Sequence, residues 1–284
     1  MKAAMERLRE FLAGQAEGDL LPWEAQREAS RRLGASLAKV EEAALEWGLM
    51  PKRYSRNRDT ISISQQLRLC RSRVAVIGCG GLGGYLIEEL ARLGVGTLVL
   101  ADPDVFEEHN LNRQLLSSPA RLGRAKVEVA RERVADINPA VTVVAHKAAF
   151  SRENGQSLLS GCSAVVDGLD NVGTRHALAA IASDLSLPFI HGAIAGWYGQ
   201  VAVQMPGEDI SPLLGPISAQ GKGLEANLGN PSFTPAAIAS LQVAEVVKIL
   251  LGRGSMSGKV LFANLLDMEF EVLRYGRGAD GRGK

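Results

Sequence analysis

The sequence predicts an α/β protein: a doubly wound, Rossmann-like and mostly parallel sheet with added antiparallel strands, preceded by a small helical appendage. One observation behind this prediction is a set of short, wholly apolar runs such as residues 74–77, which are typical of strands buried on both faces of a parallel sheet. The other is that these runs alternate with longer segments of helical periodicity, and this βαβ order is typical of a doubly wound sheet.

Composition and charge exclude several classes of protein. Of the 284 residues, 46% are hydrophobic and 22% are charged, as in ordinary globular proteins. The 32 Lys and Arg residues almost balance the 31 Asp and Glu residues, so the net charge of +1 predicts neither a nucleic-acid partner nor a membrane partner. We expect no apolar run of the ~18 residues that span a bilayer, and no secretory signal at the charged N-terminus.

The cysteines of the chain are few and isolated. They are Cys70, Cys79 and Cys162. An odd, sparse count is typical of reduced thiols, so we expect a cytoplasmic protein. It also excludes an all-cysteine zinc site within one chain, because such a site needs four thiolates.

Residues 1–52 are predicted to form a helical appendage. Pro22 is expected near the start of a helix that Gly34 ends, and Ser36 is expected to cap the next one. Two or three short helices bury little apolar surface alone. We therefore expect the appendage to dock on the main domain or on a partner.

Residues 53–275 are predicted to form the main domain. Strands are expected at 74–78, 97–102, 141–145, 164–167 and 188–191, antiparallel strands at 199–204 and 259–264, and helices at 82–93, 126–137 and 234–251. Residues 206–231 are rich in Gly, Pro, Ser and Asn, which predicts a long mobile and functional connection. Residues 276–284 are expected to be a disordered tail.

A glycine-rich turn lies between the first strand and helix of the main domain. Its glycines are Gly78, Gly80, Gly81 and Gly83, and Asp102 ends the next strand 19 residues after Gly83. Glycines let the backbone approach a phosphate, and the helix N-terminus adds N–H donors. The turn therefore predicts a nucleotide, with NAD, FAD and ATP all open at this point.

Charged residues after the glycine turn favour ATP. The helix N-terminus is enough to stabilise the pyrophosphate of a dinucleotide. A triphosphate carries more negative charge and needs cationic side chains such as Arg113 and Lys126. Asp170 and Asn171 follow a later strand, at the edge of the sheet where ligands bind. A carboxylate there predicts a Mg²⁺ ligand, and we assign it to Asp170.

These motifs together resemble the ThiF/MoeB/HesA family, the bacterial relatives of ubiquitin-activating enzymes. The matching motifs are Gly78-x-Gly80-Gly81-x-Gly83, Asp102-x-Asp104, Asn110-Leu111-x-Arg113-Gln114, Lys126 and Asp170-Asn171. The resemblance runs from about residue 53 to about residue 275. Upstream, Arg53-Tyr54-Ser55-Arg56-Asn57 is similar to the R-Y-S-R-Q element of the family, with Asn57 in place of Gln.

The resemblance implies an adenylyltransferase that uses ATP and Mg²⁺. Its expected substrate is the C-terminal glycine carboxylate of a ubiquitin-like sulfur-carrier protein that ends in Gly-Gly. The glycine turn would approach the nucleotide, and Asp102 would bind the ribose. The phosphates would be bound by Asn110, Arg113 and Lys126, and the remaining matching positions, Asp104, Gln114 and Asn171, would also contact the cofactor. Arg56 would cross a homodimer interface to the ATP of the partner subunit.

The sequence departs from the family in its cysteines. It lacks the two C-x-x-C pairs that bind zinc in many members, and it has no cysteine within 206–231. We therefore expect no zinc, no thioester on this chain, and a separate persulfide donor of sulfur. Three alternatives stay open: adenylation of a small-molecule or peptide carboxylate, an NAD-dependent oxidoreductase, and a non-catalytic scaffold.

Overall fold

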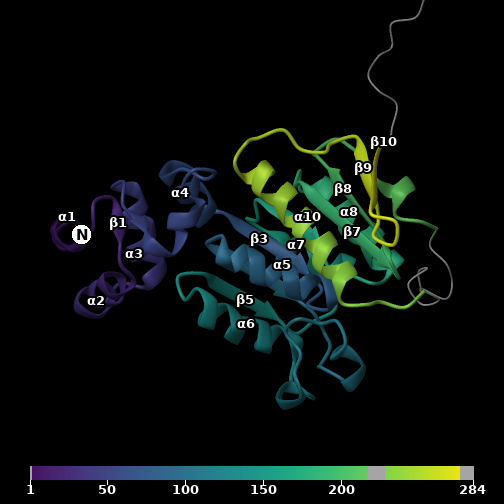
Figure 1. Ribbon diagram of the computed structural model, residues 1–284, viewed down its shortest axis with the longest axis horizontal. Helices are drawn as coiled ribbons and strands as arrows, with labels where there is room; N and C mark the ends of the chain where they lie inside the picture. The colour runs from purple at the N-terminus through teal and green to yellow at the C-terminus, as the bar shows by residue number, and fades with distance from the viewer. Residues whose placement is uncertain (1, 217–227, 276–284) are drawn as a thin grey trace, which may run out of the picture.

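The structure, a computed structural model, describes residues 2–216 and 228–275 (Figure 1). Its centre is an eight-stranded sheet in the order β10-β9-β8-β7-β6-β3-β4-β5. Pairing is parallel from β7 through β6, β3 and β4 to β5, and antiparallel from β7 through β8 and β9 to β10. The predicted Rossmann-like, mostly parallel sheet with added antiparallel strands is confirmed.

The strands of the sheet fall into these two groups. The parallel strands are β3 (Arg73–Ile77), β4 (Thr97–Ala101), β5 (Thr142–His146), β6 (Ala164–Asp167) and β7 (Phe189–Ala195), and the antiparallel strands are β8 (Tyr198–Gln204), β9 (Lys259–Asn264) and β10 (Glu269–Arg274). Strand order reverses at β3, because β4 and β5 lie on one side of it and β6 and β7 on the other. Ligands of doubly wound sheets bind outside the carboxyl ends of the strands at such a reversal.

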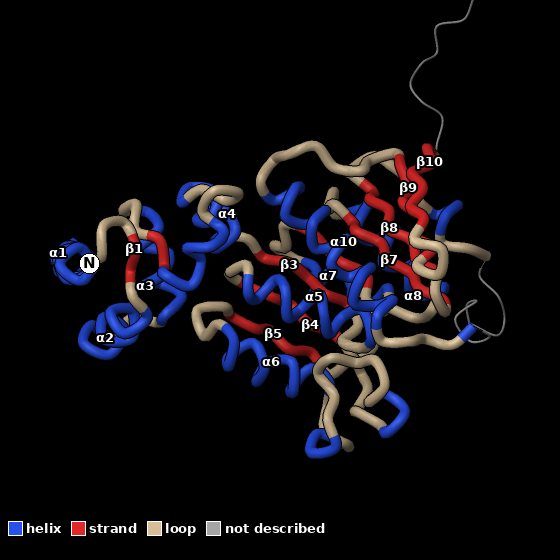
Figure 2. The backbone as a smooth tube through the Cα atoms, in the orientation of Figure 1, coloured by secondary structure: helices blue, strands red, loops and turns tan. Residues whose placement is uncertain are grey.

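Helices cover both faces of the sheet (Figures 1 and 2). One face carries α5 (Gly81–Arg92), α6 (Lys126–Ile137) and α10 (Phe233–Leu250), and the other carries α7 (Arg152–Leu159) and α8 (Val172–Asp184). Alternate residues of β3 supply the two cores: Val74 and Val76 pack on the α5 side, and Ala75 and Ile77 on the α8 side. This two-sided burial explains why the strand is wholly apolar.

Three features of the structure were not predicted from the sequence. They are α4 (Ile63–Arg71), the edge strand β10, and a two-residue parallel pair, β1 (Leu20–Leu21) with β2 (Met50–Pro51), inside the appendage that we expected to be entirely helical. Every residue of β10 is exposed, and it alternates polar and apolar side chains instead of forming a buried apolar run. Two-residue strands carry no periodicity from which they could be predicted.

The appendage consists of α1 (Lys2–Gln15), α2 (Trp23–Leu33) and α3 (Leu37–Glu46), followed by the 3-10 helix η1 (Lys52–Asn57). The predicted start and end of α2 and the predicted cap of α3 are confirmed: Pro22 is the N-cap of α2, Gly34 ends α2 with a φ of 64°, and the Ser36 side chain accepts a hydrogen bond from the Lys39 N–H. The appendage contacts the main domain, because α3 packs on α4.

Helix α10 corrects one expectation. We expected no apolar segment long enough to cross a membrane. The 18 residues of α10, however, have a mean hydropathy of 1.4, so this helix could do so by length and composition. In the structure α10 packs on α5 and β7, and half of it is buried. Ile238 and Val246 are completely buried against the sheet. The apolar composition of α10 therefore corresponds to its place in the core.

Part of the predicted connection 206–231 is described. The 3-10 helix η4 (Ser211–Leu213) lies between Ile210 and Leu214, and both of these side chains are buried on the α8 side of the sheet. Residues 217–227, in the middle of the connection, and the predicted tail 276–284 lie outside the described residues.

Candidate active site

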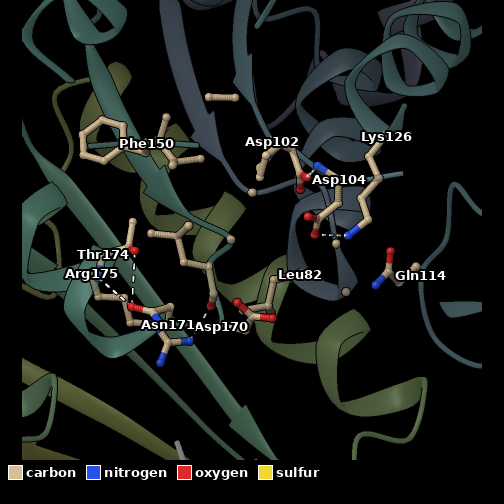
Figure 3. Close-up of a pocket in the computed structure, with 18 of the residues that line it drawn as sticks. Leu82, Asp102, Asp104, Gln114, Lys126, Phe150, Asp170, Asn171, Thr174 and Arg175 are labelled. Atoms are coloured by element: carbon tan, nitrogen blue, oxygen red, sulfur yellow. Dashed lines mark hydrogen bonds and ion pairs between the residues drawn. The ribbon is translucent and has the colours of Figure 1, made fainter. Parts of the chain in front are cut away.

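A pocket of about 320 Å³ lies where the carboxyl ends of β3, β4 and β6 meet (Figure 3). This is the reversal point of the sheet, where the topology predicts a ligand. The polar residues that line it are Asp102, Asp104, Arg113, Gln114, Lys126, Asp170, Asn171, Thr174, Arg175 and Asn230. An apolar wall is formed by Ile77, Leu82, Phe150, Leu169 and Ile194.

The glycines of the turn have two different functions. Gly78, Gly80 and Gly81 line the pocket, and an added Cβ at Gly81 would meet nothing closer than Pro235 Cβ at 3.7 Å. Gly78 has a φ of +94°, and a Cβ there would lie 2.5 Å from the Gly168 carbonyl oxygen. Gly83 does not line the pocket, and its Cβ would lie 1.9 Å from the Gly78 carbonyl oxygen. The outer glycines therefore allow backbone to pack on backbone, and the inner ones are open to a ligand.

Asp102 closes the turn from the end of β4. Its Oδ2 accepts a hydrogen bond from the Cys79 N–H at 2.7 Å, and its Oδ1 accepts one from the Asp104 N–H at 2.8 Å. Burial raises the pKa of Asp102, while Lys126 and the two N–H donors lower it. Each carboxylate oxygen keeps a lone pair for a further donor, such as a ribose hydroxyl.

Two basic residues, Lys126 and Arg113, line the pocket as well. Lys126, the first residue of α6, places its Nζ 2.9 Å from Asp104 Oδ2. The Arg113 Nη1 donates to the His109 carbonyl oxygen at 3.1 Å and to Asn112 Oδ1 at 2.9 Å. These contacts hold both cations beside the pocket, where they can neutralise phosphates.

Gln114 lies beside the glycine turn with part of its hydrogen-bonding capacity unused. A Cβ on Gly80 would lie 3.6 Å from Gln114 Nε2, and the buried Gln114 Oε1 has no hydrogen-bond partner among the described residues. A buried acceptor without a partner is rare in proteins and indicates a missing ligand or water. Gln114 therefore fits a cofactor-binding position.

The acidic side of the pocket is formed by the segment between β6 and α8. Asp170 is exposed, and Asn171 caps α8 by accepting a hydrogen bond from the Thr174 N–H at 3.0 Å. Among the described residues no group of three or more His, Cys, Asp or Glu side chains could hold a metal. One pocket carboxylate fits Mg²⁺, since Mg²⁺ in such sites takes its other ligands from phosphates and water.

A buried polar network supports this segment from behind. Asp167 and His191 are almost inaccessible, and His191 Nδ1 lies 2.7 Å from Asp167 Oδ2. The other ring nitrogen lies 3.0 Å from the Gln200 Nε2, which can only donate, so Nδ1 carries the proton. Burial lowers the pKa of His191, which favours this neutral form. The Arg175 Nε, 3.3 Å from Asp167 Oδ2, supplies the balancing positive charge.

The structure does not bring every predicted site residue into the pocket. Arg56, Gly83 and Asn110 are not among the lining residues. Asn110 is buried, and its Oδ1 accepts a hydrogen bond from the Glu107 N–H at 2.9 Å, so it shapes the loop that carries Arg113. The exposed Arg56 lies in η1, which packs near the start of β4 through Tyr54 and Gly94, whereas the pocket lies at the other end of the strands.

Sequence reasoning missed several lining residues: Phe150, Thr174, Arg175 and Asn230. Arg175 is the most informative of them. It lies in α8, one of the helices that cover the sheet, yet it is only 5% exposed. Its position in the first turn after the Asp170-Asn171 motif is a signal that could have identified it.

The cysteines lie in places unsuited to nucleophilic chemistry. Cys79 and Cys162 are buried, and burial raises the pKa of both thiols. Burial, with Glu41 and Glu42 nearby, raises the pKa of Cys70 to about 12. A nucleophilic cysteine needs a lowered pKa and access to its substrate.

Comparison with known proteins gives close sequence relatives. The chain is 35% identical over 228 residues to the SAMP-activating enzyme E1 of Haloferax volcanii, a match that covers 78% of this chain and 84% of that protein. It is 36% identical over 210 residues to the molybdopterin-synthase adenylyltransferase of Salmonella typhimurium, covering 72% and 83%. It is 35% identical over 219 residues to the sulfur carrier protein adenylyltransferase of Thermus thermophilus, covering 73% and 80%.

Solved structures share the fold at lower identity. E. coli MccB, crystallised with ATP, is 19% identical, with a TM-score of 0.68 over 90% of this chain and 83% of MccB. PaaA is 22% identical, with a TM-score of 0.65 over 87% of this chain and 73% of PaaA. Residues 54–281 match the ThiF family, which agrees with the resemblance that the motifs indicated. The chain therefore belongs to the ThiF family.

Proposed function

We propose that this protein is an ATP-dependent adenylyltransferase that activates the C-terminal glycine carboxylate of a ubiquitin-like sulfur-carrier protein as an acyl-adenylate. The product would serve sulfur transfer in molybdopterin, tungstopterin or thiamine-type biosynthesis in the cytoplasm. The observation that carries the proposal is that Arg113, Lys126, Asp170 and the glycine turn all line the same pocket. Its relatives named as sulfur-carrier and molybdopterin-synthase adenylyltransferases support the same reaction.

The reaction explains why the pocket needs positive charge. A carboxylate oxygen of the substrate attacks the α-phosphorus of ATP, a new P–O bond forms, and the bond to the bridging oxygen breaks to release pyrophosphate. Nucleophile and leaving group are both anions, so the protein must neutralise charge and hold them in line. No general base is required, because the carboxylate is already ionised near pH 7.

The described residues fit separate parts of ATP. Gly80 and Gly81 leave room for the phosphates beside the N-terminus of α5. Arg113 and Lys126 would bind the leaving pyrophosphate, and Asp102 would bind the ribose hydroxyls. Asp170 would hold Mg²⁺, which supplies further positive charge to the phosphate oxygens when it is bound.

Arg56 would act in the other subunit of a homodimer. The support for this is its place in η1, at the opposite end of the strands from the pocket of its own chain. A second copy of the chain is a direct way to bring this arginine to a pocket, because a twofold symmetric dimer repeats each contact.

The raised pKa values of all three cysteine thiols favour a reaction without a thioester on this chain. Sulfur would then come from a separate persulfide donor. Zinc is not part of the proposal.

The test is ATP–pyrophosphate exchange, run with candidate carrier proteins that end in Gly-Gly and with Mg²⁺. Exchange is expected only with a carrier, and Arg113→Ala or Asp170→Asn should abolish it while the protein stays folded. Exchange that is unchanged in both variants would reject the site assignment. Exchange with a small carboxylate or another peptide, but with none of the carriers, would reject the carrier as substrate.

Mixing inactive variants tests the contribution of Arg56. Arg56→Ala and Arg113→Ala should each be inactive alone. In a mixed dimer, one of the two sites keeps both arginines, so random mixing should restore about a quarter of the wild-type exchange. No recovery on mixing, although the mixed dimers form, would contradict the contribution of the partner subunit.

A further inference from the structure

The backbone of Leu169 is held from two sides just before Asp170. Its N–H donates a hydrogen bond to Asp167 Oδ1 at 2.8 Å, and its carbonyl oxygen accepts one from Arg175 Nη2. The two peptide groups that flank the Leu169 Cα are therefore each held at one polar atom, which limits rotation about the backbone bonds of Leu169. The direction in which the next residue leaves this segment is therefore set by Asp167 and Arg175.

The two side chains that hold Leu169 are themselves paired. Asp167 and Arg175 have side-chain exposures of 0% and 6%, and the Arg175 Nε lies 3.3 Å from Asp167 Oδ2. Two further groups support Asp167: His191, and Gln242, whose Nε2 donates to the Asp167 carbonyl oxygen at 2.9 Å. Because this ion pair is buried and supported, its geometry is fixed before any ligand arrives.

The far end of the segment is fixed as well. Asn171 begins α8 as its N-cap and accepts a hydrogen bond from the Thr174 N–H. Asp170 lies between the two fixed points, and its side chain is exposed at the pocket (Figure 3). Arg175 approaches the same segment from α8, and Figure 3 shows it beside Asn171 and Asp170. Asp170 is thus an accessible carboxylate on a rigid support.

We propose that Arg175 is a positioning residue that, together with Asp167, holds Leu169 so that the Asp170 carboxylate meets the Mg²⁺ of bound ATP. Arg175 acts through the backbone and contacts neither the metal nor the nucleotide. The inference rests on the proposed function, because it assumes that Asp170 binds the metal. Groups that orient a metal ligand typically change metal affinity by roughly 10–100-fold when they are removed.

The geometry of arginine suits this position. Its guanidinium places Nε toward Asp167 and Nη2 toward the Leu169 carbonyl oxygen at the same time. A lysine ammonium would keep the charge beside Asp167, but as a single point it cannot reproduce both contacts. Arg175→Lys should therefore fold and yet orient Asp170 poorly.

The experiment measures metal binding directly. The protein is saturated with the non-reacting analogue α,β-methylene ATP, and Mn²⁺ is titrated in and followed by its electron paramagnetic resonance signal. In Arg175→Gln the dissociation constant of Mn²⁺ should rise by roughly 10–100-fold. The affinity for the analogue without metal, measured by calorimetry, should stay at its wild-type value. Arg175→Lys should weaken Mn²⁺ binding in the same direction.

Two results would overturn the inference. One is unchanged Mn²⁺ affinity in Arg175→Gln and Arg175→Lys. The other is a metal-free analogue affinity that falls by the same factor, because Arg175 would then contact the nucleotide itself. If Arg175→Gln does not fold, the double variant Asp167→Asn/Arg175→Gln removes both charges of the pair and is measured in its place, with the same expected rise.

Controls separate this inference from the proposed function. Arg133→Gln removes another arginine that pairs with a carboxylate, Glu88 at 2.9 Å, away from the pocket, and it should leave Mn²⁺ binding unchanged. Asp170→Asn should weaken Mn²⁺ binding at least as much as Arg175→Gln. A wild-type protein without ATP–pyrophosphate exchange would contradict the proposed function. Normal exchange together with unaltered Mn²⁺ binding in the Arg175 variants would contradict only the inference.

Discussion

The Lys126 Nζ lies 2.9 Å from Asp104 Oδ2, and the two side chains differ strongly in exposure, 8% for Lys126 and 63% for Asp104. The nearly buried cation of the pocket is thus neutralised by a carboxylate that water can reach. An arriving phosphate can take over the lysine while Asp104 turns to solvent, so the charge of Lys126 stays compensated in both states.

This difference in exposure predicts that the two halves of the ion pair contribute unequally to stability. Asp104→Asn removes the ion-pair partner of a nearly buried ammonium and leaves it only the more distant charge of Asp102, so it should lower the free energy of unfolding by about 1–3 kcal/mol. Lys126→Met leaves only a solvated carboxylate and should cost less. Urea unfolding of both variants without nucleotide checks this, and equal losses would contradict it.

The glycine turn predicts opposite results for two neighbouring substitutions. Gly83→Ala places a Cβ 1.9 Å from the Gly78 carbonyl oxygen, so it should reduce stability by about 1–3 kcal/mol or more. Gly81→Ala meets nothing closer than Pro235 Cβ at 3.7 Å and should fold normally. It should nevertheless weaken ATP binding, because Gly81 lines the pocket. Urea unfolding and protection from melting by ATP with Mg²⁺ separate the two effects, and a Gly83→Ala protein as stable as wild type would disprove this account of the turn.

His191 predicts a loss of stability on mild acidification. Burial lowers its pKa in the folded state below the value of about 6.5 typical of an unfolded chain. The unfolded state therefore binds more protons as the pH falls below about 7, and the folded state loses up to roughly 1 kcal/mol per pH unit. The charged side chains beside His191 are Asp167, at 2.7 Å from its Nδ1, and Arg175, which pairs with the same Asp167 oxygen.

The measurement for His191 is the free energy of unfolding from pH 8 to pH 5, in wild type and in His191→Gln. The variant should lose part of the pH slope, and a matched change at the exposed His109, His109→Gln, should retain it. Buried Asp102 and Glu41 have raised pKa values and contribute a slope of the opposite sign at lower pH, which cancels in the comparison of variants. Identical slopes in wild type and His191→Gln would be inconsistent with a buried neutral histidine.

The burial of the cysteines predicts that they are dispensable for the chemistry. A variant with Cys70→Ala, Cys79→Ala and Cys162→Ala should retain exchange at about the wild-type rate, since two of these thiols are buried, Cys70 is half-buried, and none has the lowered pKa of a nucleophile. Wild-type protein incubated with ATP and carrier should form no adduct that a thiol reductant cleaves. Detection of such an adduct on one of these cysteines would contradict the prediction.

The contact between the appendage and the main domain depends on Tyr54. Its hydroxyl donates to Glu41 Oε1 at 2.7 Å and accepts a hydrogen bond from Asn138 Nδ2 at 2.8 Å, and all three residues are buried. Tyr54→Phe leaves these polar groups without their partner and should cost about 1–3 kcal/mol. Tyr198→Phe, at a side chain that is 46% exposed, should cost almost nothing. Similar losses for the two variants in urea unfolding would contradict this account.

Much of the site could be predicted because its signals are local. The glycines of the turn, Asp102, Lys126 and Asp170 each follow or begin a predicted element, and the strands carry them to one edge of the sheet. Arg175 gave only the signal of its place one turn after the Asp170-Asn171 motif, and His191 ends a predicted strand but gave no indication of its partner. Their partner Asp167 lies 24 residues from His191 in the sequence, and only packing of β6 beside β7 and α8 brings the three together.

The sequence alone determined the alternation of buried strands and helices and the residues at the carboxyl ends of those strands, because periodicity and turn chemistry are properties of short segments. The tertiary structure decided which of those residues share the pocket, that Arg56 lies at the other end of the strands, and that Leu169 is held by Asp167 and Arg175. The physical reason is that burial and pairing of polar side chains are set only when strands and helices pack together, both for residues near in the chain, such as Asp167 and Leu169, and for distant ones, such as Asp167 and His191.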